Sequence, residues 1–320
     1  MTGVRWAAGR LAGAVLTLFG VAVVVFLVLR VIPGNAITAA FGVQSGMLSG
    51  AQRAALEHYY GLDKPLAGQF AGWLGALVQG NLGVSLTSGQ PVANLISASL
   101  PVTVELAALA ALIGAAAGLL LGVLAASSPG HARDSVTQGA ALSGLAIPEF
   151  VLGSVVVAAL AQAFGYFPDT GSFVPLTRSV PGNLSQMLYP ALVLAVGFAA
   201  NVMRTTRSSY LEFAAADFVR TARGKGVPPW RIRIRHVLRN ASVPAVTITG
   251  IQFGYLLGGT VIIEQIFALP GLGRLLFTSI SDRDYPVVQS SVLLIAFGFV
   301  LVNLIADLLY RAIDPRTRTA

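Results

Sequence analysis

Few residues of this chain have the types and spacing that enzyme catalysis requires. The sequence has no Ser-x-x-Lys pair, no nucleophile elbow, no His-Glu-x-x-His helix and no paired carboxylates in a hydrophilic stretch. Gly224-Lys225-Gly226 lacks the spacing of a phosphate-binding loop, so we do not expect the chain to hydrolyse ATP by itself. There is no cysteine, and the three histidines lie far apart. We therefore expect no catalytic, cofactor-binding or metal site.

Four acidic residues fall within long apolar stretches, where an ionised carboxylate costs about 2.5–3.5 kcal/mol at the centre of a bilayer. They are Glu105, Glu149, Glu264 and Asp307. Each can line a polar path, or it can tie helices together through hydrogen bonds. Glu105 and Asp307 lie near the ends of their stretches, which favours a tie. Candidates for a translocation path or gate are therefore Glu149, Asn201, Gln252 and Glu264.

A basic segment, residues 204–240, is the other candidate for function. It has two acids, Glu212 and Asp217, and nine basic residues: Arg204, Arg207, Arg220, Arg223, Lys225, Arg231, Arg233, Arg235 and Arg239. Residues 212–223 have a helical composition, glycines interrupt it, and Pro228-Pro229 restarts a helix at Trp230. The pattern predicts a helix-turn-helix along the inner membrane surface. Its charge suits anionic lipid as well as a protein partner.

The composition indicates a membrane protein that positions these residues on helices. Of 320 residues, 55% are hydrophobic and 11% are charged, with a mean hydropathy of +0.75. A helix needs about 20 apolar residues to span a bilayer. The first apolar stretch is too long for a signal peptide. We predict an all-α integral membrane fold with about six transmembrane helices, near residues 10–32, 101–126, 135–164, 184–206, 242–267 and 287–310.

Positive residues accumulate on the cytoplasmic side of membrane proteins, and this rule orients the chain. A cytoplasmic N-terminus places fifteen of the 21 Lys and Arg residues inside, and both termini are then cytoplasmic. The net charge of +8 thus reflects orientation and contact with membrane lipid, and we expect no nucleic-acid partner. The predicted regions are 1–32, an N-terminus and first span; 33–100, extracytoplasmic; and 101–320, a core containing the segment 204–240.

The extracytoplasmic region has two amphipathic patches, at residues 51–60 and 66–78, which predict short helices over the first two spans. It can be a packed lid without any contact with a ligand. Glycine recurs every four residues in two of the predicted spans, at Gly114, Gly118 and Gly122, and at Gly250, Gly254 and Gly258. Such faces let helix backbones approach closely in a membrane. We expect both stripes to pack against neighbouring helices.

The stretch 217–226, Asp-Phe-Val-Arg-Thr-Ala-Arg-Gly-Lys-Gly, is followed by Trp230, His236-Val-Leu-Arg-Asn240 and Val243-Pro244. It resembles the coupling loop of ABC importer permeases, and more closely that of the B-type permeases of dipeptide and oligopeptide importers. Further similar blocks cover nearly the whole chain in order, at residues 29–34, 60–65, 80–85, 264–273, 284–286, 307–311 and 314–316. The resemblance implies the fold of a type I importer permease.

The resemblance also implies that the loop docks into a groove on a cytoplasmic ATPase. The general pattern is Glu-Ala-Ala, three residues and Gly; Gly226 fits the glycine, whereas Arg220, Thr221 and Ala222 occupy the leading positions, as in the peptide-importer variant. The residues that would carry the coupling are Ala215, Ala216, Asp217, Arg220, Thr221, Ala222, Arg223, Lys225, Gly226, Trp230 and Arg231.

The implied partners are a second homologous permease, two ATPase subunits that bind ATP and Mg, and an extracytoplasmic solute-binding protein. The implied cargo is a dipeptide or oligopeptide carried across the cytoplasmic membrane, with haem or nickel as alternatives. An ion-coupled secondary carrier, in which Glu149, Glu264 and Asp307 would bind protons or sodium, is a different class of function. A membrane scaffold or receptor without transport is a third class.

Overall fold

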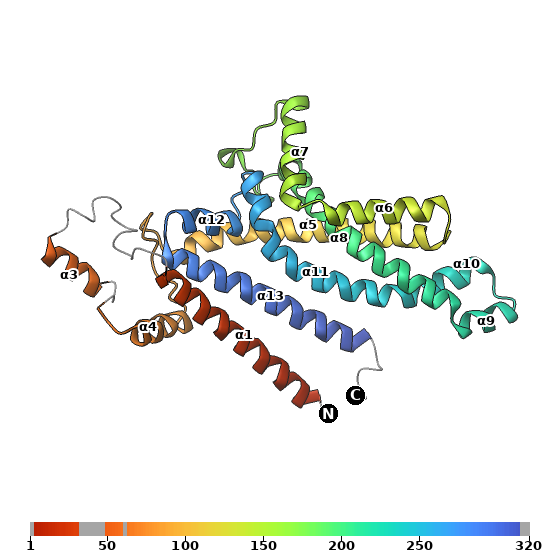
Figure 1. Ribbon diagram of the computed structural model, residues 1–320, viewed down its shortest axis with the longest axis horizontal. Helices are drawn as coiled ribbons and strands as arrows, with labels where there is room; N and C mark the ends of the chain where they lie inside the picture. Colours follow the sequence, from red (N-terminus) through yellow and green to blue (C-terminus); the bar gives the residue numbers. More distant parts are fainter. Residues whose placement is uncertain (1–2, 32–48, 60–62, 314–320) are drawn as a thin grey trace. The chain divides into compact units, whose positions relative to one another are not determined.

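The computed structural model describes residues 3–31, 49–59 and 63–313 (Figure 1). Three of the stretches that resemble the permease family, residues 29–34, 60–65 and 314–316, lie wholly or partly outside the described residues. Among these residues the regular secondary structure is helical, apart from one isolated bridge between Val84 and Pro91, and turns and loops join the helices. The helices are α1 Gly3–Val31, α3 Gly50–Tyr59, α4 Leu66–Val78, α5 Val92–Ala126, α6 Ala132–Ala146, α7 Glu149–Phe164, η2 Thr170–Ser172, α8 Val180–Ala215, α9 Asp217–Gly224, α10 Pro229–Arg231, η3 Ile232–Leu238, α11 Arg239–Ile266, α12 Leu272–Ser281 and α13 Tyr285–Ile313.

The prediction of an all-α membrane protein is confirmed. Among the described residues, five helices are long and apolar enough to cross a membrane, and α6 with α7 forms a sixth candidate if the pair is one span. These candidates match the six predicted stretches, although α5 begins at Val92, before the expected start at Pro101. A helix satisfies all its own backbone hydrogen bonds in hydrocarbon, where no water is available. This explains why each of the predicted apolar stretches is helical.

The third predicted span, residues 135–164, is sharply broken in the structure. α6 and α7 meet at an angle of 97° (Figure 1). Pro148 lacks an N–H donor and disfavours helical geometry at the preceding residue, and Ile147 accordingly has φ −84° and ψ 119°. The break therefore makes Glu149 the first residue of α7.

The described chain forms two compact units. Unit 1 comprises residues 1–103 and 270–298, and unit 2 comprises residues 104–269 and 299–320. In unit 1, the patches predicted at 51–60 and 66–78 are the helices α3 and α4, and Trp73 of α4 stacks on Phe26 of α1. The buried Asp284 accepts hydrogen bonds from the Ser85 hydroxyl and from the Leu86 N–H, which ties the segment after α4 to the start of α13.

In unit 2, the predicted close packing of the first glycine stripe is confirmed. A Cβ atom added at Gly118 would lie 2.7 Å from the carbonyl oxygen of Ala199, and one at Gly122 would lie 2.6 Å from Cβ of Thr206. α5 and α8 are thus in backbone contact along this face. The second stripe is confirmed in part: Gly250 and Gly254 meet side chains of α13, whereas Gly258 has open space beside it.

Candidate functional site

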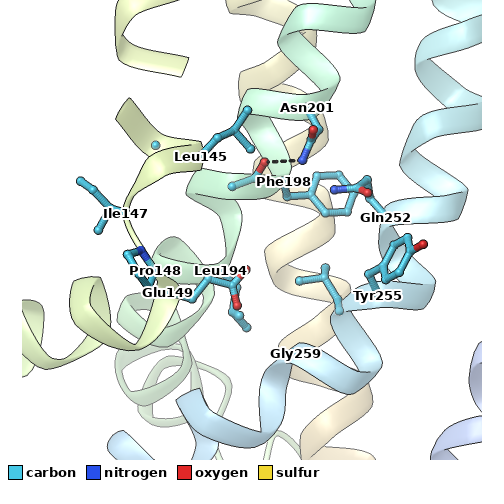
Figure 2. Close-up of a pocket in the computed structure, with 13 residues that line it drawn as sticks. Leu145, Ile147, Pro148, Glu149, Leu194, Phe198, Asn201, Gln252, Tyr255 and Gly259 are labelled. Atoms are coloured by element: carbon cyan, nitrogen blue, oxygen red, sulfur yellow. Dashed lines mark hydrogen bonds between the residues drawn. The ribbon is translucent and has the colours of Figure 1, made fainter. Parts of the chain in front are cut away.

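A cavity of about 260 Å³ lies within unit 2, between the break of α6 and α7, one face of α8 and one face of α11 (Figure 2). It contains three of the four predicted path residues, Glu149, Asn201 and Gln252. The fourth, Glu264, is fully buried on α11 and is not among the residues that line the cavity. The other lining residues are Gly144, Leu145, Ile147, Pro148, Leu194, Gly197, Phe198, Tyr255, Leu256 and Gly259.

Two glycines lie beside the Glu149 carboxylate. A Cβ atom at Gly197 of α8 would lie 3.8 Å from Oε1 of Glu149, and one at Gly259 of α11 would lie 3.6 Å from Oε2. Both oxygens therefore lie over stretches of helix that carry no side chain. Because α7 starts at this residue, the carboxyl group enters the cavity at the break in the helix pair.

The remaining polar groups of the cavity are amides and a hydroxyl. The Asn201 side chain donates a hydrogen bond from Nδ2 to the carbonyl oxygen of Gly197, at 3.1 Å (Figure 2). Gln252 is half-buried, and Tyr255 is exposed, with its ring against that of Phe299. One acid, two amides and a phenol supply no nucleophile with an adjacent base, but they can bind a polar ligand. Over the described part of the chain no cluster of three or more His, Asp or Glu residues could hold a metal ion.

The predicted basic segment, residues 204–240, is largely helical. The helix predicted to restart at Trp230 differs from the prediction, because it is continuous with the next span. Arg204 and Arg207 belong to α8, which continues to Ala215. The helix that starts at Pro229 continues through the π-helical η3 into α11, so Trp230 and Arg231 begin the fifth candidate span, residues 229–266. The prediction of a separate second surface helix is therefore wrong, because nothing after Pro229 interrupts the helix.

The first predicted helix and its glycine turn are confirmed. α9 covers Asp217–Gly224, and Gly226 has a φ of +75°, a conformation that favours glycine. The turn is closed by hydrogen bonds from the Gly226 N–H to the Arg223 carbonyl oxygen, at 3.0 Å, and from the Val227 N–H to that of Ala222, at 3.1 Å.

α9 has one apolar face and one polar face. Val219 is 1% exposed and packs in a cluster with Ala126, Tyr210, Ile232, Val237 and Ala241, which belong to α5, α8, η3 and α11. Most of the predicted coupling residues are exposed: Asp217, Arg220, Thr221 and Arg223 on α9, and Lys225 and Gly226 in the turn that follows it. Ala216 and Ala222 are half-buried, while Ala215, Trp230 and Arg231 are exposed. Through Val219, α9 therefore packs against α5, α8, η3 and α11.

Two protein-family models match the chain. The family described as binding-protein-dependent transport system inner membrane component matches residues 118–319, and the model of its N-terminal region matches residues 3–107. The chain belongs to this family. The permease is accordingly a multi-pass inner-membrane subunit and not an enzyme, and permeases of its family work with ATPase and binding-protein partners in ABC importers.

Curated relatives match the permease over nearly its full length. It is 37% identical over 310 residues to the glutathione transport system permease protein GsiC of Escherichia coli O6:H1, with 97% of each chain covered. It is 39% identical over 312 residues, again 97% of each chain, to a Brucella abortus (strain 2308) protein whose name assigns it to a peptide transport system as a permease. A crystal structure of an amino acid ABC transporter with histidines aligns with a TM-score of 0.50 at 19% identity, covering 70% of the permease and 94% of that chain. This likeness shows a shared fold.

Sequence reasoning missed one ion pair of the permease. Arg207 of α8 donates from Nε to Oδ1 of Asp134, at 2.7 Å, and from an Nη to Oδ2, at 2.8 Å. The Asp134 side chain is 3% exposed and also accepts from the Gly130 N–H and from the Gln138 amide. The pair holds the turn between α5 and α6 against α8. The two residues are 73 positions apart, and no local motif connects them.

Proposed function

We propose that this permease carries short peptides across the inner membrane, together with a second homologous permease, two ATPase subunits and an extracytoplasmic solute-binding protein. The observation that carries the proposal is the full-length similarity, at 37–39% identity, to permeases whose names specify glutathione and peptide transport. Glutathione is itself a small peptide. A cavity with one carboxylate and two amides suits a ligand that has peptide bonds and charged ends.

The proposal assigns coupling to α9. Its exposed face has Arg220 and Arg223, which can pair with acidic groups on an ATPase. Its buried Val219 lies against the ends of α5, α8 and η3, so a movement of the docked helix would reach all three. α8 and α11 also line the cavity, and α9 is therefore placed to link nucleotide-driven closure to the peptide path.

Reconstitution of the complete importer in liposomes tests the proposal. We expect uptake of radiolabelled trialanine only when ATP is inside the vesicles and the solute-binding protein is outside. The chain alone in ATP-free liposomes, with or without a proton or sodium gradient, should give no uptake. Uptake by the chain alone would support a secondary carrier and overturn the importer. No uptake by the complete assembly would overturn the assignment of peptides as cargo.

Two substitutions at Gly226 test the coupling role of α9 in the same uptake assay. Asn tolerates the left-handed backbone of Gly226 and Val does not, while a Cβ there would meet no atom within 4 Å. We expect Gly226→Val to lose most ATP-driven uptake, because the turn after α9 is strained. The matched variant Gly226→Asn should stay within about twofold of wild type. Equal uptake by both variants would show that the geometry of this turn plays no part in coupling.

A further inference from the structure

The carboxylate of Glu149 has no neutralising group in the part of the permease that the structure describes. Neither of its oxygens takes part in a hydrogen bond or ion pair with a described residue. Asp134 in the same unit, by contrast, is bound by a guanidinium, an amide and a backbone N–H. Glu149 is thus a free acceptor at the wall of a cavity, within a pair of helices that is a candidate membrane span.

The surroundings of this carboxylate favour a cationic ligand. Leu145, Ile147 and Leu194 line the cavity beside the carboxylate, and Glu149 is itself exposed, so a ligand can reach its oxygens. Gly197 and Gly259 leave both oxygens open to an incoming group. A single carboxylate is too small a donor set for a divalent metal ion, which takes several protein ligands. An ammonium group, with three N–H donors, matches a carboxylate and can form charge-assisted hydrogen bonds to it.

Two amides of the cavity suit a peptide bond next to the ammonium group. Asn201 and Gln252 line the same cavity from α8 and α11, and an amide side chain can both donate to and accept from a peptide bond (Figure 2). The volume of about 260 Å³ lies just below the usual range of small-molecule pockets, so it suits the first residues of a peptide rather than a large ligand.

We propose that Glu149 binds the α-ammonium group of the transported peptide in this cavity, and that Asn201 and Gln252 hydrogen-bond to the first peptide bond. The inference rests on the proposed function as a peptide importer and names the chemical group that the cavity recognises. The permease itself then selects peptides with a free, charged N-terminus, independently of any selection by the solute-binding protein.

Equilibrium binding to the complete importer tests this role without the solute-binding protein. The assembly of permeases and ATPases, in lipid nanodiscs without ATP, is dialysed against radiolabelled trialanine or N-acetyl-trialanine. We expect wild type to bind trialanine at least tenfold more tightly than the acetylated peptide. Glu149→Gln should weaken trialanine binding about tenfold and leave the acetylated peptide unchanged, and Glu149→Asp should keep a preference for the free N-terminus.

A matched control distinguishes the effect of removing the charge in the cavity from the effect of removing a charge elsewhere on the permease. Glu212→Gln makes the same chemical change at an exposed residue in the last turn of α8, and it should leave both dissociation constants unchanged. Thermal unfolding of each assembly checks that the variants fold. The inference fails if Glu149→Gln weakens both peptides equally or neither, or if wild type shows no preference or no binding. The proposed function is tested separately: it fails if the complete wild-type importer shows no ATP-driven uptake of trialanine in liposomes.

Discussion

Two carboxylates of unit 2 differ in what surrounds them, and this separates a structural residue from one that is available to a ligand. Asp134 accepts hydrogen bonds from Arg207, Gly130 and Gln138, so all its acceptor positions are directed at the protein. Glu149 faces a cavity and two glycines. The sequence placed Glu149 in an apolar stretch and Asp134 in the polar stretch 128–138, but it showed neither the partners of Asp134 nor the cavity beside Glu149.

The buried ion pair should contribute to stability. Asp134→Asn removes one charge and leaves the Arg207 guanidinium, whose side chain is 22% exposed, without its bidentate partner. Loss of a partner for a largely buried charged group costs about 1–3 kcal/mol. We expect the variant to unfold several degrees below wild type in detergent, measured by tryptophan fluorescence on heating.

The control for this variant is an identical change in an exposed pair. Asp217 and Arg220 lie 3.1 Å apart on α9, with side chains 93% and 77% exposed, and such pairs contribute little. Asp217→Asn should leave the unfolding temperature within about 1 °C of wild type. If both variants lower the unfolding temperature equally, the buried contact of Asp134 on α6 with Arg207 on α8 does not explain the loss of stability.

At the scale of helices, glycine determines how closely α5 and α8 approach. The Cβ of an alanine at Gly118 would lie 2.7 Å from the Ala199 backbone oxygen, and backbone cannot rotate aside as a side chain can. Gly258 has no atom within 4 Å of the same point. The two glycines thus share a spacing pattern in sequence but not a packing role.

The matched pair Gly118→Ala and Gly258→Ala tests this difference. Gly118→Ala should separate α5 from α8 and destabilise the permease by about 1–3 kcal/mol, as overpacking does. Gly258→Ala should be neutral or slightly stabilising, since alanine favours a helix by up to about 1 kcal/mol over glycine. Thermal unfolding in detergent compares the two. A larger loss for Gly258→Ala would contradict the packing that the structure shows.

Elements defined by local pattern were predictable, and those defined by distant contacts were not. Apolar length identified the candidate spans, and glycine spacing identified the face of α5 that packs on α8. A proline such as Pro148 interrupts a helix, but the angle of 97° between α6 and α7 depends on the packing around it. Three path residues meet in one cavity because of that bend, and the pairing of Asp134 with Arg207 depends on the tertiary fold.

At the scale of the whole molecule, the bent pair α6–α7 decides the number of crossings. If the pair crosses the bilayer, Ser127 before α6 and Ser172 after α7 lie on opposite sides; if it is re-entrant, they lie on the same side. A same-side arrangement would reverse the direction of α8 and place the basic residues from 220 to 239 on the opposite side from the turn before α6. Because positive residues are retained in the cytoplasm, we expect a crossing.

The absence of cysteine makes this arrangement directly measurable, since each introduced thiol is the only one in the chain. Ser127, Ser172 and Thr221 are exposed and lie outside the apolar helix cores. We expect a membrane-impermeant maleimide to label Ser172→Cys in intact spheroplasts, and to label Ser127→Cys and Thr221→Cys only in inverted vesicles. Labelling of Ser127→Cys and Ser172→Cys from the same side would show that α6–α7 is re-entrant. Labelling of Thr221→Cys from outside would place α9 beyond the reach of a cytoplasmic ATPase and defeat its coupling role.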